Sequence, residues 1–263
     1  MITSTNGLSL FSGVDAAINN ALEITSYRHK SKFREVIENP PKSFNGVNFV
    51  ESIFKLIEEN WESCVIGKAR KPSAENWRWL QPTKPPADRN SSAEVCLERA
   101  LVDVCLKAGR TDWSNQVPLA KFVGQRSYGR KAIDLVHRRG ERAFDLIELK
   151  VASDNPLYAA MEILQYGLVW FLSRRDKSKL DYTGNPIIEA DDVRLVVLAP
   201  EPFFEGRDFR WLEKHLGDGL AALGEKQAIK LGFQFHAFPS PFRGKLKYEA
   251  KDLLAAVVKR LGL

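Results

Sequence analysis

The sequence contains only three cysteines, Cys64, Cys96 and Cys105, and no CxxC pair. An odd number of thiols without paired spacing argues against a disulfide framework and a structural zinc site, so we expect buried apolar thiols. No stretch approaches the ~18 consecutive apolar residues of a membrane helix, and the N-terminus lacks a basic segment followed by an apolar one. These absences predict a cytoplasmic protein without membrane contact.

Several common catalytic motifs are also missing. The chain has no P-loop and no GxSxG element, and its Gly217-Asp218-Gly219 stretch has neither a preceding strand nor the third glycine of a dinucleotide-binding loop. The histidines show no pair at metal-ligand spacing. The formal net charge of +6 and the pI near 9.2 favour a polyanionic partner such as nucleic acid.

Hydrophobic periodicity divides the chain into an N-terminal helical region with a linker, residues 1–90, and a second domain, residues 91–263. Apolar residues at helical spacing predict one helix from Ser12 to about Lys30 and another through Val50–Cys64. The basic, proline-containing stretch 68–92 has no sustained period and predicts an extended connection.

The second domain reads as helix, three strands, helix, strand, helix, strand, helix. The predicted strands are 113–122, 130–138, 142–151, 193–200 and 232–238, and the predicted helices are 91–109, one from Pro156, one from about Asp208, and 248–261. Only Arg139–Glu141 separate the second and third strands, which predicts an antiparallel hairpin. This order predicts an α/β fold with a central mixed sheet flanked by helices.

Three charged residues lie in the predicted hairpin. Asp134 interrupts an apolar run, while Glu148 and Lys150, two residues apart near the end of the next strand, share a face. We expect Asp134 to reach them only if the register is offset or the strands diverge. If they converge, a divalent cation would relieve the repulsion between the carboxylates, and oxygen ligands suit Mg²⁺ better than zinc. A nearby lysine would orient water or neutralise charge developing on a phosphate, as phosphodiester hydrolysis requires.

These residues resemble the PD-(D/E)xK nucleases, which have the restriction-endonuclease-like fold. The resemblance rests on Asp134 in AIDLV, on Glu148-Leu149-Lys150 as the E-x-K element, and on the order of elements over roughly residues 91–200. Ile133 occupies the position of the motif's proline, which is often absent in relatives. The resemblance implies an enzyme that cleaves DNA with Mg²⁺, or with Mn²⁺ as a substitute, and leaves 5′-phosphates.

The resemblance also implies a glutamate from the preceding helix. The ERxLV pattern of archaeal Holliday-junction resolvases, with glycine eleven positions later, matches Glu98 and Gly109 and favours Glu98 over Glu94. The two glutamates are one helical turn apart, so both could face the sheet.

By the same resemblance, the catalytic residues would be Glu98, Asp134, Glu148, Lys150 and Gln165. Asp134, Glu148 and Glu98 would hold the metal, Lys150 would position water or stabilise the transition state, and Gln165 would add a polar group from the following helix.

Two basic segments could follow a phosphate backbone. The turn that leads into the Asp134 strand carries Lys121, Arg126, Tyr128, Arg130 and Lys131. In the linker, cations alternate with Trp77 and Trp79, as in proteins that bind single strands, although these tryptophans could instead dock on the core.

Other interpretations remain open. The hairpin charges could form a surface ladder of ion pairs, Glu98 a pair within its helix, and Gln165 a satisfied polar contact. His137 faces away from Asp134 and is either structural or in contact with DNA. A nucleic-acid-binding module could also keep this fold without turnover. A homodimer would suit two-fold symmetric cutting of a duplex, but the sequence shows no interface.

Overall fold

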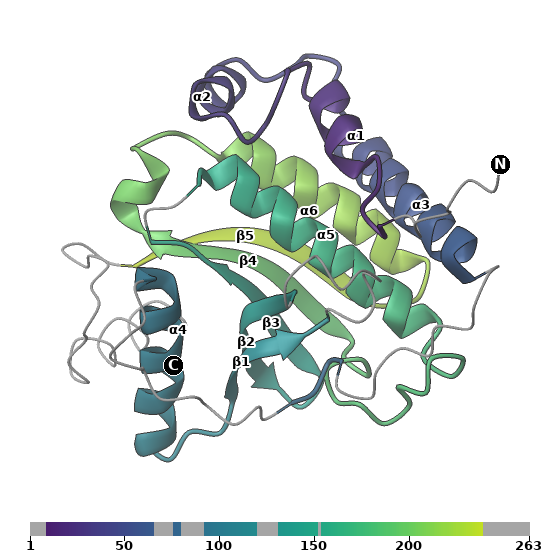
Figure 1. The fold of residues 1–263 in the computed structure, drawn as a ribbon, viewed down its shortest axis with the longest axis vertical. Coiled ribbons are helices and arrows are strands. Elements are labelled where there is room, and N and C mark those ends of the chain that lie inside the picture. The colour runs from purple at the N-terminus through teal and green to yellow at the C-terminus, as the bar shows by residue number, and fades with distance from the viewer. Residues whose placement is uncertain (1–8, 66–75, 80–91, 120–130, 152–153, 239–263) are drawn as a thin grey trace, which may run out of the picture.

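The computed structural model describes residues 9–65, 76–79, 92–119, 131–151 and 154–238 (Figure 1). Its centre is a five-stranded sheet in the order β1-β2-β3-β4-β5. The strands are β1 (Trp113–Pro118), β2 (Ala132–Gly140), β3 (Ala143–Leu149), β4 (Asp192–Pro200) and β5 (Lys230–Phe238). β1, β2 and β3 pair antiparallel, and β3, β4 and β5 pair parallel. The predicted α/β class with a mixed sheet is confirmed.

Helices flank this sheet. They are α1 (Val14–Ala21), α2 (Lys30–Glu38), α3 (Gly46–Val65), α4 (Ala93–Lys107), α5 (Pro156–Arg175) and α6 (Arg210–Glu225), with a short 3₁₀ helix η1 (Glu201–Phe204) after β4. The predicted helix from Ser12 to Lys30 is therefore too long, and α2 was not predicted. The predicted helix 248–261 lies outside the described residues.

Side-chain caps fix the start of the two helices nearest the hairpin. Ser92 Oγ accepts a hydrogen bond from the Val95 N–H at 3.4 Å and begins α4. Asn155 Oδ1 accepts one from the Tyr158 N–H at 2.9 Å, and Pro156 occupies the first turn of α5. These caps set where α4 and α5 pass the sheet.

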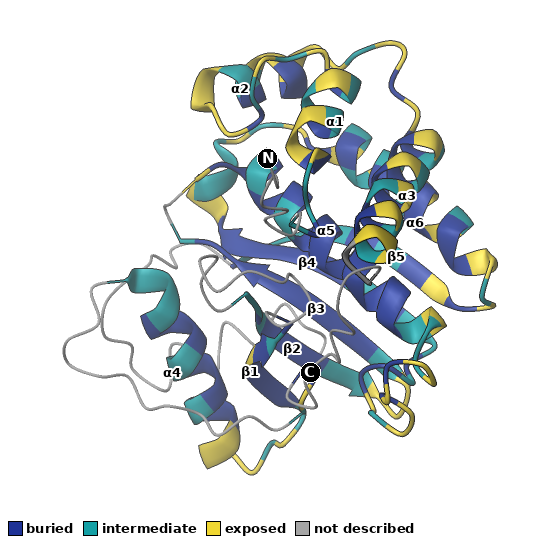
Figure 2. Ribbon diagram, turned by 45° about the vertical axis from the view of Figure 1, so that its right-hand side comes forward, coloured by how far each residue is buried: buried dark blue, intermediate teal, exposed yellow. Residues whose placement is uncertain are grey.

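The sheet separates two apolar clusters, as the burial colours of Figure 2 show. Strand alternation sends Phe144 and Leu146 to the α5 side and Ile147 and Leu149 to the α4 side. α5 is buried almost all round, as its nearly continuous apolar sequence predicts. By the same alternation, Glu148 projects toward α5.

The N-terminal helices share the larger cluster with the sheet. Residues of α1 and α3 belong to the same buried cluster as α5 and α6. α3 lies so close to α6 that a methyl group at Gly219 would overlap the backbone carbonyl of Gly46. Within the part of the chain that the structure describes, no helix is long and apolar enough to cross a membrane.

Trp77 and Trp79 dock on this core. Trp77 is fully buried, and its Nε1–H donates to Ser173 Oγ at 3.1 Å. The Trp79 and Phe144 rings form a T-shaped pair with 5.6 Å between their centroids. These contacts support the structural interpretation of the two tryptophans. Cys96 and Cys105 are buried, as expected.

Candidate functional site

The β2–β3 hairpin brings Asp134 beside Glu148. The ladder runs from the turn to Leu135 opposite Ile147, so the next positions along the two strands are Asp134 and Glu148. Asp134 Oδ2 accepts a hydrogen bond from the Leu149 N–H at 3.0 Å. The expectation that this meeting needs an offset register is met, because the ladder shifts register between Arg138 and Gly140 before it reaches Leu135.

Lys150 lies among three carboxylates. Its Nζ is 2.8 Å from Glu148 Oε1, 3.2 Å from Glu162 Oε2 and 3.5 Å from Asp154 Oδ2. The Lys150 and Glu148 side chains are only 8% and 5% exposed, so this is a nearly dry ion pair rather than a surface ladder.

Glu162 and Tyr166, which sequence reasoning did not single out, extend the cluster from α5. The Tyr166 hydroxyl donates to Glu162 Oε1 at 3.0 Å, and Lys131 Nζ donates to the Tyr166 oxygen at 3.4 Å. The available signal was a carboxylate in an otherwise apolar helix, one turn before a tyrosine. Of the predicted basic turn, Lys131 is thus brought to the site; Lys121, Arg126, Tyr128 and Arg130 lie outside the described residues.

Gln165 makes a different contact from the one expected. Its Nε2 donates to the Met161 carbonyl at 3.1 Å within α5, and the side chain is buried. The α5 side chain that contacts Lys150 is Glu162, three residues earlier.

Both α4 glutamates face the sheet. Glu98 is 2% exposed, and its two oxygens accept hydrogen bonds from Asn115 Nδ2 and Gln116 Nε2, each at 2.6 Å. Glu94 Oε1 accepts one from the Val151 N–H at 3.2 Å, just after Lys150. The structure therefore places Glu98 within a buried polar contact and Glu94 at the loop that follows β3.

The backbone of β1 is distorted where Gln116 reaches Glu98. Gln116 has a φ of 51°, in the left-handed region that is unfavourable for residues other than glycine. Its two chain neighbours pair with β2, whereas Gln116 itself, at the level of Asp134, does not. At this distortion the side-chain amide of Gln116 donates its hydrogen bond to the Glu98 carboxylate.

We call Glu98, Asp134, Glu148 and Glu162 the carboxylate cluster. Burial, followed by the charge of Asp134, raises the pKa of Glu98 to about 7. Burial raises the pKa of Asp134 to about 6, even though the Leu149 hydrogen bond and Lys150 oppose the shift. Burial and the charges of Asp134 and Glu162 raise the pKa of Glu148 well above its ordinary value. The ionised carboxylates thus destabilise one another in a poorly solvated place.

Lys150 and Glu162 shift in the sense of an ion pair. Burial alone would lower the pKa of Lys150, but the Glu148 and Glu162 carboxylates raise it above its usual range. The pKa of Glu162 is lowered: burial opposes the shift, and Lys150 and a hydrogen bond with Glu148 outweigh it. Lys150 therefore stays protonated at any physiological pH.

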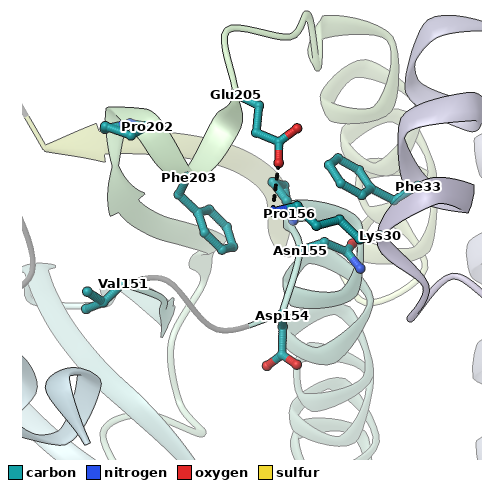
Figure 3. A pocket seen from close by; sticks show the side chains of 9 residues that line it. All are labelled: Lys30, Phe33, Val151, Asp154, Asn155, Pro156, Pro202, Phe203 and Glu205. Atoms are coloured by element: carbon teal, nitrogen blue, oxygen red, sulfur yellow. Dashed lines mark ion pairs between the residues drawn. The ribbon is translucent and has the colours of Figure 1, made fainter.

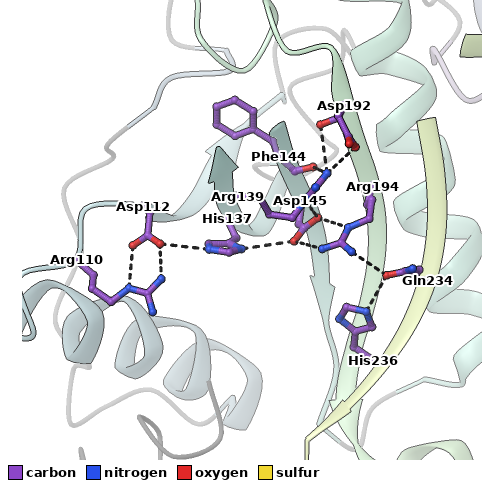
Figure 4. A network of polar contacts seen from close by, with 10 residues as sticks. All are labelled: Arg110, Asp112, His137, Arg139, Phe144, Asp145, Asp192, Arg194, Gln234 and His236. Atoms are coloured by element: carbon purple, nitrogen blue, oxygen red, sulfur yellow. Dashed lines mark hydrogen bonds and ion pairs between the residues drawn. The ribbon is translucent and has the colours of Figure 1, made fainter. Parts of the chain in front are cut away.

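A second polar network lies on the other face of the sheet (Figure 4). His137 lies between Asp112, at 3.3 Å, and Asp145, at 3.5 Å, and stacks on Trp113 with 4.3 Å between ring centroids. The Asp145 carboxylate is 1% exposed and also binds Arg194 at 2.7 Å. The 1% exposure of His137 fits the structural interpretation.

The two networks differ in how their charges are balanced. Although burial opposes it, His137 and two arginines, Arg194 and Arg139, lower the pKa of Asp145. In the carboxylate cluster the pKa values of three acids are raised instead. Buried charges that are matched by opposite charges need no ligand to balance them, whereas acids held in an unfavourable ionised state are typical of functional sites. The carboxylate cluster is therefore the candidate functional site.

No group of three or more His, Cys, Asp or Glu side chains is arranged as a formed metal site within the described ranges. Comparison of the chain with family models, curated proteins and solved structures gave no match. The functional argument therefore depends on the chemistry of the site itself.

Proposed function

We propose that this protein is a Mg²⁺-dependent nuclease of the PD-(D/E)xK type that hydrolyses DNA phosphodiester bonds on a restriction-endonuclease-like core. The observation that supports it most is the meeting of Asp134, Glu148 and Lys150 at one end of the hairpin. These are the three residues on which the family resemblance depends.

The chemistry of the donor set fits Mg²⁺, with Mn²⁺ as a substitute, because all the side-chain ligands are carboxylate oxygens. Asp134, Glu148 and Glu98 would hold the ion, which when bound polarises the phosphate and lowers the pKa of an attacking water. Burial, and after it repulsion between carboxylates, raises the pKa values of these three acids, and a bound divalent cation would offset both effects. Because no such group is preformed among the described side chains, we expect the carboxylates to turn toward the ion on binding.

Lys150 acts in this proposal as a fixed positive charge. Its raised pKa makes it a poor proton acceptor, so it would donate hydrogen bonds to phosphate oxygens rather than deprotonate the water. Glu148 and Glu162 hold its ammonium in place. The Lys131 ammonium, against Tyr166, would contact a neighbouring phosphate.

The test is cleavage of supercoiled plasmid and of a labelled single strand in Mg²⁺, Mn²⁺ or EDTA. We expect cutting by the wild type with either metal, none in EDTA, and a loss of at least a hundredfold in Lys150→Ala, as when a preorganised charge is removed. Lys214→Ala, which removes an exposed lysine paired with Asp218, is the control and should cut normally. Metal-dependent cutting that persists in Lys150→Ala would refute the assignment of this site.

The Lys131 ammonium beside the site would also suit one other function, a nucleic-acid-binding module on the same fold. Such a module would bind DNA in EDTA as well as in Mg²⁺ and would never nick it. Affinity measured in both conditions beside the cleavage assay separates the two functions, and the salt dependence of that affinity reports how many phosphates are neutralised.

A further inference from the structure

A pocket of about 210 Å³ lies beyond Lys150, between the start of α2, the start of α5 and η1 (Figure 3). This volume is several times the ~30 Å³ that one water occupies in the liquid and lies below the ~300 Å³ at which pockets for drug-sized ligands begin. The pocket therefore suits one small group, such as a single ring system, rather than a whole nucleotide.

Two aromatic side chains point into this pocket. Phe33 comes from α2 and Phe203 from η1, and in Figure 3 their rings approach from opposite sides of Pro156. Phe33 is fully buried and Phe203 is partly exposed. Flat apolar walls of this kind favour a planar ligand, since aromatic faces stack on π systems.

The polar groups on the pocket wall are mainly acceptors. The Glu205 carboxylate forms ion pairs with Lys30 Nζ at 3.2 Å and with Arg34 Nε at 2.8 Å. The Arg34 hydrogen bonds lower the pKa of Glu205 to about 2. Glu205 therefore remains an acceptor throughout the physiological pH range, and Asp154 adds a second carboxylate. Arg34, Arg207 and Lys30 occupy both oxygens of the Glu205 carboxylate. The exposed Asp154 carboxylate is therefore the wall acceptor that would receive the N–H groups on the edge of a heterocycle.

The pocket wall contacts Lys150 and Glu94, which lie next to the carboxylate cluster. Asp154 lines the pocket and its Oδ2 is 3.5 Å from Lys150 Nζ. Val151, which also lines the pocket, donates its N–H to Glu94. A nucleotide whose phosphate lies at Lys150 therefore has this pocket next to it.

We propose that the pocket holds an unpaired base of the nucleic acid, stacked on Phe203, beside the phosphate that is cut. This inference rests on the proposed nuclease function and adds a substrate feature to it: a nucleotide turned out of the stack or already single-stranded. Unpaired bases offer both the π face and the free N–H edge that the walls require.

The test uses a single-stranded oligonucleotide with the fluorescent base 2-aminopurine placed at each position in turn, titrated with protein in Ca²⁺ without Mg²⁺. We expect the fluorescence of one position to change strongly on binding and that change to be lost in Phe203→Ala and Phe203→Leu. Affinity should fall roughly tenfold in both variants, within the range found when a stacking ring is removed. Phe203→Leu keeps most of the apolar volume and guards against a loss that comes only from misfolding.

Phe235→Leu is the matched control, since its ring is also partly exposed and packs on Phe209 and Phe233, but it does not line the pocket. It should bind and report like the wild type. An abasic nucleotide at the responsive position should weaken wild-type binding roughly tenfold and leave Phe203→Leu unchanged, because the lost contact is the same.

Failure of this proposal and failure of the nuclease function give different results. Metal-dependent cleavage with no position responding to Phe203, or an equal effect of Phe235→Leu, overturns the base pocket alone. A Phe203-dependent response without any cleavage in Mg²⁺ supports the pocket and overturns the nuclease. Binding of free nucleosides without binding of the oligonucleotide overturns the pocket as a substrate site.

Discussion

Replacement of Gln116 by glycine should shift the pH dependence of metal binding and cleavage to higher pH. The Gln116 amide donates to Glu98 Oε2 at 2.6 Å and favours the ionised carboxylate. A hydrogen bond to a charged group is worth about 1.5–3 kcal/mol, and 1.36 kcal/mol corresponds to one pKa unit. Its loss should raise the pKa of Glu98 from about 7 by at least about one unit. At pH 7 the ionised fraction then falls from roughly half to roughly a tenth.

Glycine is the right substitution because of the backbone. Gln116 has a φ of 51°, which costs a residue other than glycine about 1–2 kcal/mol. Gln116→Gly keeps this conformation and relieves the strain, which offsets part of the lost hydrogen bond. Asp181→Gly is the control, because Asp181 is exposed, has a φ of 60° and lies outside the site.

The assays are the rate of Mg²⁺-dependent cleavage and calorimetric Mg²⁺ binding between pH 6 and pH 9. We expect about a fivefold loss in Gln116→Gly at pH 7 that recovers by pH 9, the ratio following from the ionised fractions. Asp181→Gly should keep the wild-type profile. A Gln116→Gly profile that matches the wild type, or that is reduced equally at every pH, would show that ionisation of Glu98 does not control the site.

Three further predictions concern stability. Without metal, the free energy of urea unfolding should fall by a few kcal/mol from pH 5 to pH 8. Folded Glu98 and Asp134, with pKa values of about 7 and about 6, hold protons that the unfolded chain releases at lower pH. Mg²⁺ should restore this free energy at pH 8, and stability that rises over this range would contradict the raised pKa values. Asp145→Asn should cost about 1.5–3 kcal/mol in the same assay, because it removes the buried carboxylate that binds the partly exposed Arg139 and Arg194, while the metal dependence of cleavage stays unchanged. Gly219→Ala should lower the melting temperature because its methyl group meets the Gly46 carbonyl. Gly217→Ala, with open space on the same helix, should raise it because glycine within a helix costs ~1 kcal/mol relative to alanine. Equal shifts would refute the close approach of α3 and α6.

Most of the sheet could be predicted because its signals are local. The connection Arg139–Glu141 predicts the hairpin, whereas the register shift between Arg138 and Gly140, which brings Asp134 beside Glu148, has no sequence signal. Helix α5 could be predicted from Asn155, Pro156 and the apolar run that follows.

The contacts that were missed depend on distant packing. Glu162 reaches Lys150 only because α5 crosses the end of β3, and helical periodicity cannot give the direction of that crossing. The left-handed backbone of Gln116 has no sequence signal, since glycine or asparagine would be expected there. α2 was missed because its segment, Lys30–Glu38, is short and rich in charge.

The hairpin and α5 together make the site largely the property of one continuous stretch of chain. Lys131, Asp134, Glu148, Lys150, Glu162 and Tyr166 all lie within residues 131–166, and α4 adds Glu98 from outside. Contacts close in sequence form with little loss of chain entropy. The segment that carries the candidate site can therefore assemble early in folding, with the docking of α4 as the later step that completes it.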